Sequence, residues 1–119
     1  MNGLHLIGDL TGCRCDPQLL LDGERFRAKC LGMVAASGLT TMDATFHQFE
    51  GSGFTGTVVL AESHLAIHTW PEHCFAAVDF FSCGDVDMDR GVAILKTAFS
   101  AASETRLELE RGPLRPLNP

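Results

Sequence analysis

Hydrophobic and polar residues recur along this chain with two periods, and the two periods separate strands from helices. Alternation of apolar and polar residues is typical of strands that bury one face, and it predicts six strands. These strands are expected at residues 3–9, 40–49, 56–61, 63–70, 75–82 and 105–111.

Apolar residues at helical spacing predict two helices. The first begins after a cap at Asp16 or Asp22 and ends at Gly38. The second begins at the cap Asp87. Its apolar face is expected to hold Val92, Leu95, Phe99 and Ala102.

The resulting order, βα-ββββ-αβ with short connections, defines the expected fold class. It predicts a two-layer α/β sandwich, in which an antiparallel sheet carries both helices on one face. Residues 1–119 are the right length for a single domain, since one core usually takes about 100–200 residues. A chain this small cannot cover both faces of the sheet, so we expect a homodimer.

Composition excludes some classes of binding partner and indicates the cellular compartment. Nine Lys and Arg against fifteen Asp and Glu give a net charge of −6, which disfavours nucleic acid and anionic membrane surfaces. No stretch approaches the roughly 18 apolar residues of a membrane span. The five cysteines are an odd number, and the N-terminus lacks the pattern of a signal peptide. These features predict a cytoplasmic protein with free thiols.

Groups that can titrate or attack are concentrated in residues 62–84, ESHLAIHTWPEHCFAAVDFFSCG. Two chemistries follow from the residue types alone. The first is a zinc site, although no C-x2-C pair is present. Its ligands would be His68, His73, Cys74 and Cys83. The second is nucleophilic catalysis by Cys83 with a histidine as base.

A third chemistry comes from a resemblance. The segments ESHLAIHTWPE and AAVDFFSCG resemble the signature of the small prokaryotic S-adenosylmethionine decarboxylases, which are pyruvoyl-dependent enzymes of polyamine biosynthesis. Weaker similarity extends through TFHQF, the turn at residues 54–56, the DVD sequence at residues 85–87 and the N-terminal HLIGD strand. Together these segments cover most of the chain.

The resemblance implies a proenzyme that cleaves itself. The bond between Glu62 and Ser63 would break, giving a β chain of residues 1–62 and an α chain of residues 63–119. Ser63 would become the pyruvoyl group and form a Schiff base with the substrate. The resemblance assigns proton transfer during processing to His68. Thr55 stands where the family usually has a serine hydroxyl that assists processing.

The same resemblance implies how a cationic small-molecule substrate is bound and decarboxylated. Cys83 would return a proton to the substrate after CO2 leaves. Glu72 matches a carboxylate for the ribose hydroxyls, and Phe49 an aromatic that stacks on adenine and the sulfonium, with Trp70 beside them. The pyruvoyl group would be the cofactor, with no metal. We also expect active sites shared between the two copies of a dimer.

Strand geometry adds one expectation about the backbone. Ser63 and His68 are five residues apart, so regular alternation places them on opposite faces of a strand. Cooperation between them therefore requires a bend or bulge near the scissile bond. A regular ladder would count against self-processing by this pair.

Two alternatives to this function remain open. The same chemistry could act on ornithine or arginine, whose distal cation needs a carboxylate such as Asp9 or Glu50. The chain could also be an unprocessed, non-catalytic homologue that keeps the fold.

Overall fold

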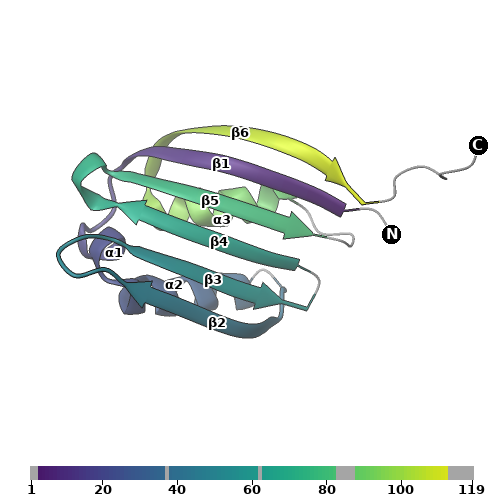
Figure 1. Cartoon of the computed structure of the whole chain (residues 1–119), viewed down its shortest axis with the longest axis horizontal. Coiled ribbons are helices and arrows are strands. Elements are labelled where there is room, and N and C mark those ends of the chain that lie inside the picture. The colour runs from purple at the N-terminus through teal and green to yellow at the C-terminus, as the bar shows by residue number, and fades with distance from the viewer. Residues whose placement is uncertain (1–2, 37, 62, 83–87, 113–119) are drawn as a thin grey trace, which may run out of the picture.

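The computed structural model describes residues 3–36, 38–61, 63–82 and 88–112. In these residues six strands form an antiparallel sheet in the order β2-β3-β4-β5-β1-β6, and three helices lie against one of its faces (Figure 1). The elements are β1 (Gly3–Cys13), α1 (Gln18–Leu21), α2 (Gly23–Ala36), β2 (Thr41–Gln48), β3 (Phe54–Leu60), β4 (Ser63–Trp70), a 3-10 turn (Pro71–His73), β5 (Phe75–Ser82), α3 (Met88–Phe99) and β6 (Ala101–Arg111). The predicted two-layer sandwich is confirmed.

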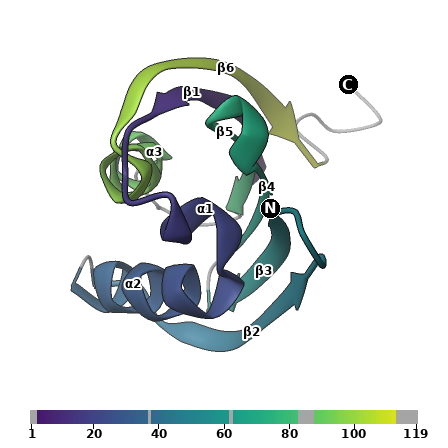
Figure 2. The ribbon, with the colours of Figure 1, turned by 90° about the vertical axis from the view of Figure 1, so that its left-hand side faces the viewer.

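The sheet curves around the helices, and the core fills the space between the two layers (Figure 2). Alternate residues of the central strands point into this core, as the pattern of buried and partly buried positions along β3, β4 and β5 shows. Phe26 of α2 lies at its centre, with its ring stacked on Phe99 at 4.5 Å and on Phe54 at 5.4 Å between centroids. The aromatic stack joins both long helices to the sheet.

Both predicted caps of the first helix are used, because the segment forms two helices rather than one. Asp16 Oδ1 accepts a hydrogen bond from the backbone N–H of Gln18 at 3.0 Å, at the start of α1. Asp22 Oδ1 accepts from the N–H of Glu24 at 3.0 Å, at the start of α2. Asx caps of this kind satisfy N–H groups that have no partner within the helix.

The second predicted helix ends earlier than expected, and the prediction for Ala102 is wrong. Ser100 has a left-handed backbone with φ of 48°, which ends α3 at Phe99, and β6 begins at Ala101. Ala102 is therefore an exposed strand residue. Val92, Leu95 and Phe99 are buried as predicted. The predicted cap Asp87 lies outside the described residues.

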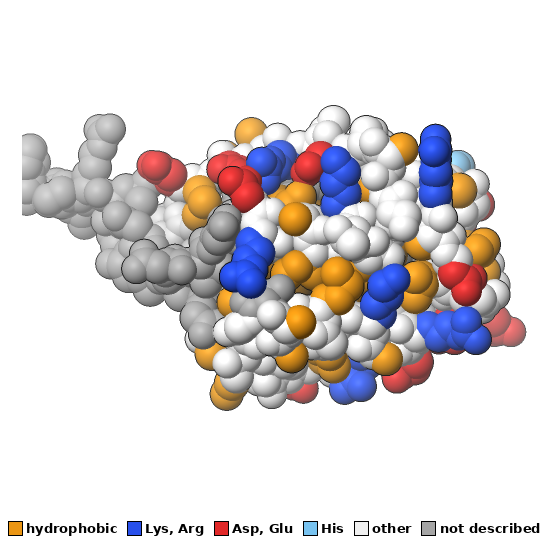
Figure 3. All heavy atoms as spheres, turned by 180° about the vertical axis from the view of Figure 1, so that it is seen from behind, with side chains coloured by type: hydrophobic (Ala, Val, Ile, Leu, Met, Phe, Trp, Pro, Cys, Tyr) orange, Lys and Arg blue, Asp and Glu red, His pale blue; other side chains and the backbone are white. Residues whose placement is uncertain are grey.

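The two faces of the sheet have different surroundings. The helix-covered side of the molecule carries scattered charged side chains (Figure 3). The opposite face, here called the uncovered face, has no helix against it in the described part of the chain. Its exposed large apolar side chains are Ile7, Val59, Trp70, Leu107 and Leu109. None of the helices in the described ranges is long and apolar enough to cross a membrane.

Candidate active site

The residues singled out from the sequence lie at the two ends of β4. Ser63 begins this strand, next to the turn from β3, and Trp70 ends it. At about 3.4 Å per residue, the two positions are about 24 Å apart. Glu62 and Cys83, to which the family resemblance assigns cleavage and proton donation, lie outside the described residues.

Ser63 and His68 point to opposite faces of the sheet. β4 pairs in unbroken register with β5 from Ser63 to Trp70, and with β3 from His64 to His68. Because both neighbouring strands hold β4 in a regular ladder, the segment from Ser63 to His68 contains no bulge. A bend or bulge was expected near the scissile bond; Ala61 is a bend, and Glu62 lies outside the described residues. The two residues are also about 17 Å apart along the strand.

The hydroxyl of Ser63 is buried at the start of β4. Its Oγ has no hydrogen-bond partner among the described residues and is closed off from solvent. The side chain lies on the same face as Leu65 and Ile67, which are fully in the core. Because buried polar atoms are nearly always hydrogen-bonded, an unpaired one suggests a role in chemistry rather than in packing.

His68 and Thr55 meet on the uncovered face. They are direct cross-strand partners in the β3–β4 ladder, and Thr55 Oγ1 lies 3.0 Å from His68 Nδ1. Both side chains are partly buried, so the imidazole remains open to an incoming group. A hydroxyl bonded to a histidine can relay a proton. The family resemblance implied proton transfer for His68 and an assisting hydroxyl for Thr55.

Aromatic side chains gather at the same end of the sheet as this pair. β2 and β4 run parallel, since each is antiparallel to β3, so the ends that carry Phe49 and Trp70 share one edge. The Trp70 ring lies 5.4 Å from Phe75 and 6.4 Å from His68 between centroids. Phe49 is exposed and its ring lies 4.7 Å from that of His47. Glu72, in the turn after Trp70, is also exposed.

A polar cluster near the Ser63 end was missed by sequence reasoning. His5 Nε2 donates to Asp79 Oδ1 at 2.8 Å, and Arg111 Nη1 donates to His5 Nδ1 at 3.1 Å. The Arg111 guanidinium also lies over the Phe81 ring at 5.9 Å. His5 and Asp79 both belong to the segments that carry the family resemblance, but they are 74 residues apart, so only the fold reveals their contact.

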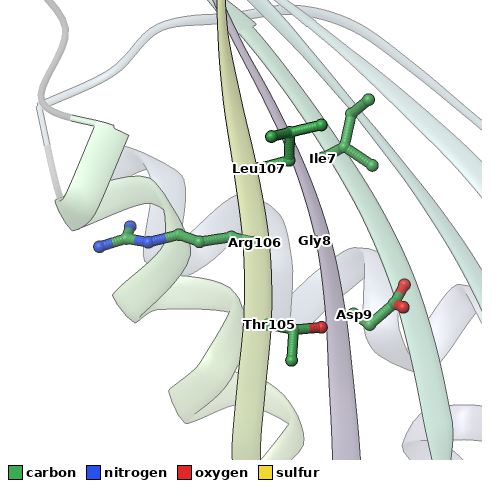
Figure 4. A pocket seen from close by; sticks show the side chains of 6 residues that line it. All are labelled: Ile7, Gly8, Asp9, Thr105, Arg106 and Leu107. Atoms are coloured by element: carbon green, nitrogen blue, oxygen red, sulfur yellow. The ribbon is translucent and has the colours of Figure 1, made fainter.

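A shallow pocket of about 290 Å³ opens beside this cluster, between β1 and β6 (Figure 4). Ile7, Asp9 and Leu107 lie on its uncovered side, whereas the Arg106 side chain extends toward α3, where it pairs with Asp89 at 2.7 Å. The pocket is lined by Ile7, Gly8, Asp9, Thr105, Arg106 and Leu107. It combines a carboxylate with apolar walls.

The members of the alternative zinc set do not come together in the described ranges. No group of three or more His, Cys, Asp or Glu side chains is placed there to hold a metal ion. Cys83, the fourth member of that set and the nucleophile of the other alternative, lies outside those ranges. Burial raises the pKa of the Cys13 and Cys30 thiols to about 11, so both remain protonated at neutral pH.

Comparison with known proteins identifies the class. A family model described as S-adenosylmethionine decarboxylase matches residues 4–112. The fold and the site therefore belong to a decarboxylase.

Individual relatives agree over nearly the whole length. The S-adenosylmethionine decarboxylase proenzyme of Pelotomaculum thermopropionicum is 40% identical over 111 residues, covering 92% of this chain and 86% of the relative. That of Acidithiobacillus ferrooxidans is 41% identical, covering 92% and 82%. The crystal structure of the adenosylmethionine decarboxylase from Aquifex aeolicus matches with a TM-score of 0.82 and 35% identity, over 95% of this chain and 92% of that one. The chain belongs to the S-adenosylmethionine decarboxylase family.

Proposed function

We propose that this protein is the proenzyme of a cytoplasmic, pyruvoyl-dependent decarboxylase that converts S-adenosylmethionine to its decarboxylated form and CO2. The observation that carries the proposal is Ser63. In a chain of this family, a buried serine hydroxyl that has no hydrogen-bond partner among the described residues follows directly on the turn between β3 and β4. Its relatives carry the word proenzyme in their names, which fits a chain that must be cleaved before it acts.

The proposed cleavage uses the Ser63 hydroxyl as an internal nucleophile. Oγ attacks the carbonyl carbon of Glu62, and the peptide bond is exchanged for an ester. Loss of the Cα proton of Ser63 then expels the Glu62 carboxylate, and hydrolysis of the remaining enamine releases ammonia and leaves a pyruvoyl group. The products are residues 1–62 and residues 63–119. Ser63 Oγ, which has no partner in the described part of the chain, fits this group, because the reaction needs a hydroxyl that no other bond holds.

His68 and Thr55 supply the proton transfers in this proposal, and they do so for a second copy of the chain. The regular β4 ladder keeps His68 about 17 Å from Ser63 of its own chain, on the other face of the sheet. A homodimer that packs the uncovered faces together, with its strands running in opposite directions, would bring the His68 end of one copy toward the Ser63 end of the other. The five exposed apolar side chains of the uncovered face support such packing.

Substrate binding is assigned to the aromatic end of the sheet. Phe49 and Trp70 offer exposed rings to the adenine and the sulfonium, and Glu72 offers a carboxylate to the ribose hydroxyls. The pyruvoyl group supplies the electron sink that decarboxylation requires. Cys83 is proposed to return the proton to the substrate. Since Ser63 and Trp70 lie at opposite ends of β4, the proposed active site is shared between the two copies.

Co-expression of two inactive variants tests both the processing and the sharing. A tagged His68→Gln chain keeps Ser63, and a Ser63→Ala chain keeps His68. Each should remain uncut alone, whereas the His68→Gln chain should be cut when the two are expressed together. Mass spectrometry should find a fragment that begins with a ketone at position 63. A His68→Gln chain that cleaves alone, or stays intact in the mixture, would contradict the shared site.

A second measurement tests the substrate. CO2 release from the processed protein is compared for S-adenosylmethionine, ornithine and arginine under one set of conditions. We expect release from S-adenosylmethionine. Activity only on an amino acid would overturn the proposed substrate and direct attention to Asp9, which lines the pocket between β1 and β6. An intact chain without activity after long incubation would mark a non-catalytic homologue.

A further inference from the structure

The end of the short helix α1 receives hydrogen bonds from two strands of the sheet. Thr69 Oγ1 donates to the carbonyl of Leu20 at 2.7 Å. Gln48 Nε2 donates to the next carbonyl, that of Leu21, at 2.5 Å. Carbonyls at the end of a helix have no partner within it, so both bonds satisfy groups that the helix leaves open. The two bonds connect β4 and β2 to consecutive carbonyls of α1, on the helix-covered side of the sheet.

The same two side chains also hold the backbone at the aromatic end. The N–H of Phe54 donates to Thr69 Oγ1 at 3.0 Å, which fixes the start of β3. Gln48 Nε2 lies 3.2 Å from the carbonyl of Gly53 and 3.3 Å from that of Phe49. Gly53 packs so closely against Thr69 that it leaves no room for a Cβ atom. The turn from Phe49 to Gly53 is thus held from behind.

Both side chains lie directly beside proposed substrate-binding residues but point away from them. Thr69 is 6% exposed and stands between His68 and Trp70, whose side chains lie on the uncovered face. Gln48 immediately precedes Phe49, and its Oε1 accepts from the N–H of Gly23 at 2.8 Å. Thr69 is buried on the helix side of the sheet, and the Gln48 amide is engaged there by the backbone of Gly23 and Leu21. Each can only set where its neighbours lie.

We propose that Thr69, together with Gln48, is a positioning residue that uses the end of α1 to hold Trp70 and Phe49 at a fixed separation for the substrate's aromatic base. The inference rests on the proposed function, because it assumes that these two rings bind the substrate. Its energetic basis is preorganisation: a ring held in place before binding loses less conformational freedom on binding. Thr69 and Gln48 therefore act on substrate affinity rather than on the chemical step.

Thr69→Val and Gln48→Met test this role, because both replacements keep the approximate shape and remove the hydrogen bonds. In processed protein we expect KM for S-adenosylmethionine to rise about tenfold or more, with kcat changed less than about threefold. Thr69→Ser keeps the hydroxyl and should restore KM. Ile67→Val is the matched control, since Ile67 lies on the same strand and face and is fully buried. It should lower Tm without changing KM.

Fluorescence gives a readout that does not depend on activity. Trp70 is the single tryptophan of the chain, so acrylamide quenching reports on this ring alone. Quenching of the unprocessed Ser63→Ala chain should increase when Thr69→Val is added, and should not change with Ile67→Val.

The outcomes separate this inference from the proposed function. Wild-type protein that does not decarboxylate S-adenosylmethionine would refute the proposed function. Active wild type, with the same KM and the same Trp70 quenching in Thr69→Val as in Ile67→Val, would refute the positioning role. A rise in KM that Thr69→Ser fails to reverse would also refute it.

Discussion

Thr55 and His68 face each other across β3 and β4 on the uncovered face of the sheet, with Thr55 Oγ1 3.0 Å from His68 Nδ1. The contact orients the imidazole, since one ring nitrogen is engaged by the hydroxyl and the other is left for a second group. A serine would keep the hydroxyl at this position, but the methyl group of threonine restricts its rotamer.

Removal of the Thr55 hydroxyl should slow self-cleavage. Thr55→Val keeps the shape of the side chain but leaves His68 Nδ1 without this partner. A positioned proton-transfer group typically contributes about 10²–10⁴-fold in rate, so we expect cleavage to slow by about 10²-fold. The rate is measured from the appearance of residues 63–119 on denaturing gels. Thr55→Ser is the control and should cleave at least as fast as the wild type. Equal rates in all three chains would contradict a role for the hydroxyl.

Neutralising Glu72 should weaken substrate binding without slowing chemistry. Hydrogen bonds to a charged group contribute about 1.5–3 kcal/mol. Glu72→Gln is therefore expected to raise KM for S-adenosylmethionine by about 10–100-fold and to leave kcat nearly unchanged. Initial rates of CO2 release over a range of substrate concentrations provide the measurement. If kcat falls in Glu72→Gln while KM stays constant, the assignment of Glu72 to substrate binding would be contradicted.

A charge on the uncovered face should break the proposed dimer. Leu107 is 56% exposed on this face, so Leu107→Glu has little to disrupt in a single chain. Within an interface, however, it would bury an unpaired carboxylate. We expect sedimentation to show a monomer that no longer cleaves itself. Glu108→Ala, on the adjacent residue and the opposite face of β6, should remain dimeric. A dimeric, self-cleaving Leu107→Glu chain would place the interface elsewhere.

The buried thiols should make stability fall at alkaline pH. The pKa of Cys30 is raised by burial from 9.0 to about 11, so the folded state favours the protonated thiol. The contribution of this thiol to the free energy of unfolding is fully present below pH 9. It is lost between pH 9 and about 11, which lowers the free energy of unfolding by roughly 2–3 kcal/mol. Chemical denaturation at several pH values measures this decrease. The alkaline decrease in the free energy of unfolding should be smaller in Cys30→Ala than in the wild type. An equal decrease in both proteins would show that another group causes it.

The sequence predicts the strands more reliably than it predicts how the site is assembled. Alternation located β4 and β5 with the bounds that the structure has, because each strand buries one face and exposes the other. The end of α3 was misplaced because Ala102 continues the helical spacing, and only the left-handed backbone at Ser100 reveals the stop. A local pattern does not carry this kind of information.

The site residues illustrate the same limit. Ser63, His68 and Trp70 are close in sequence, but a strand spreads neighbours over its full length. Conversely, His5 and Asp79 are far apart in sequence and in contact in space. Periodicity correctly placed Ser63 and His68 on opposite faces. No bulge between them reconciles these positions, because the ladders on both sides of β4 are regular, and the bend near the scissile bond lies at Ala61.

The placement of Ser63 and His68 at different ends and on different faces of one strand has a kinetic consequence. A newly made chain that needs a second copy to cut itself cannot mature while it is alone. At low abundance its activation should follow the square of its concentration, and at high abundance the order should fall to one. The rigid length of β4 would thus make maturation slow whenever little protein has been synthesised, because cleavage then waits for two copies to meet.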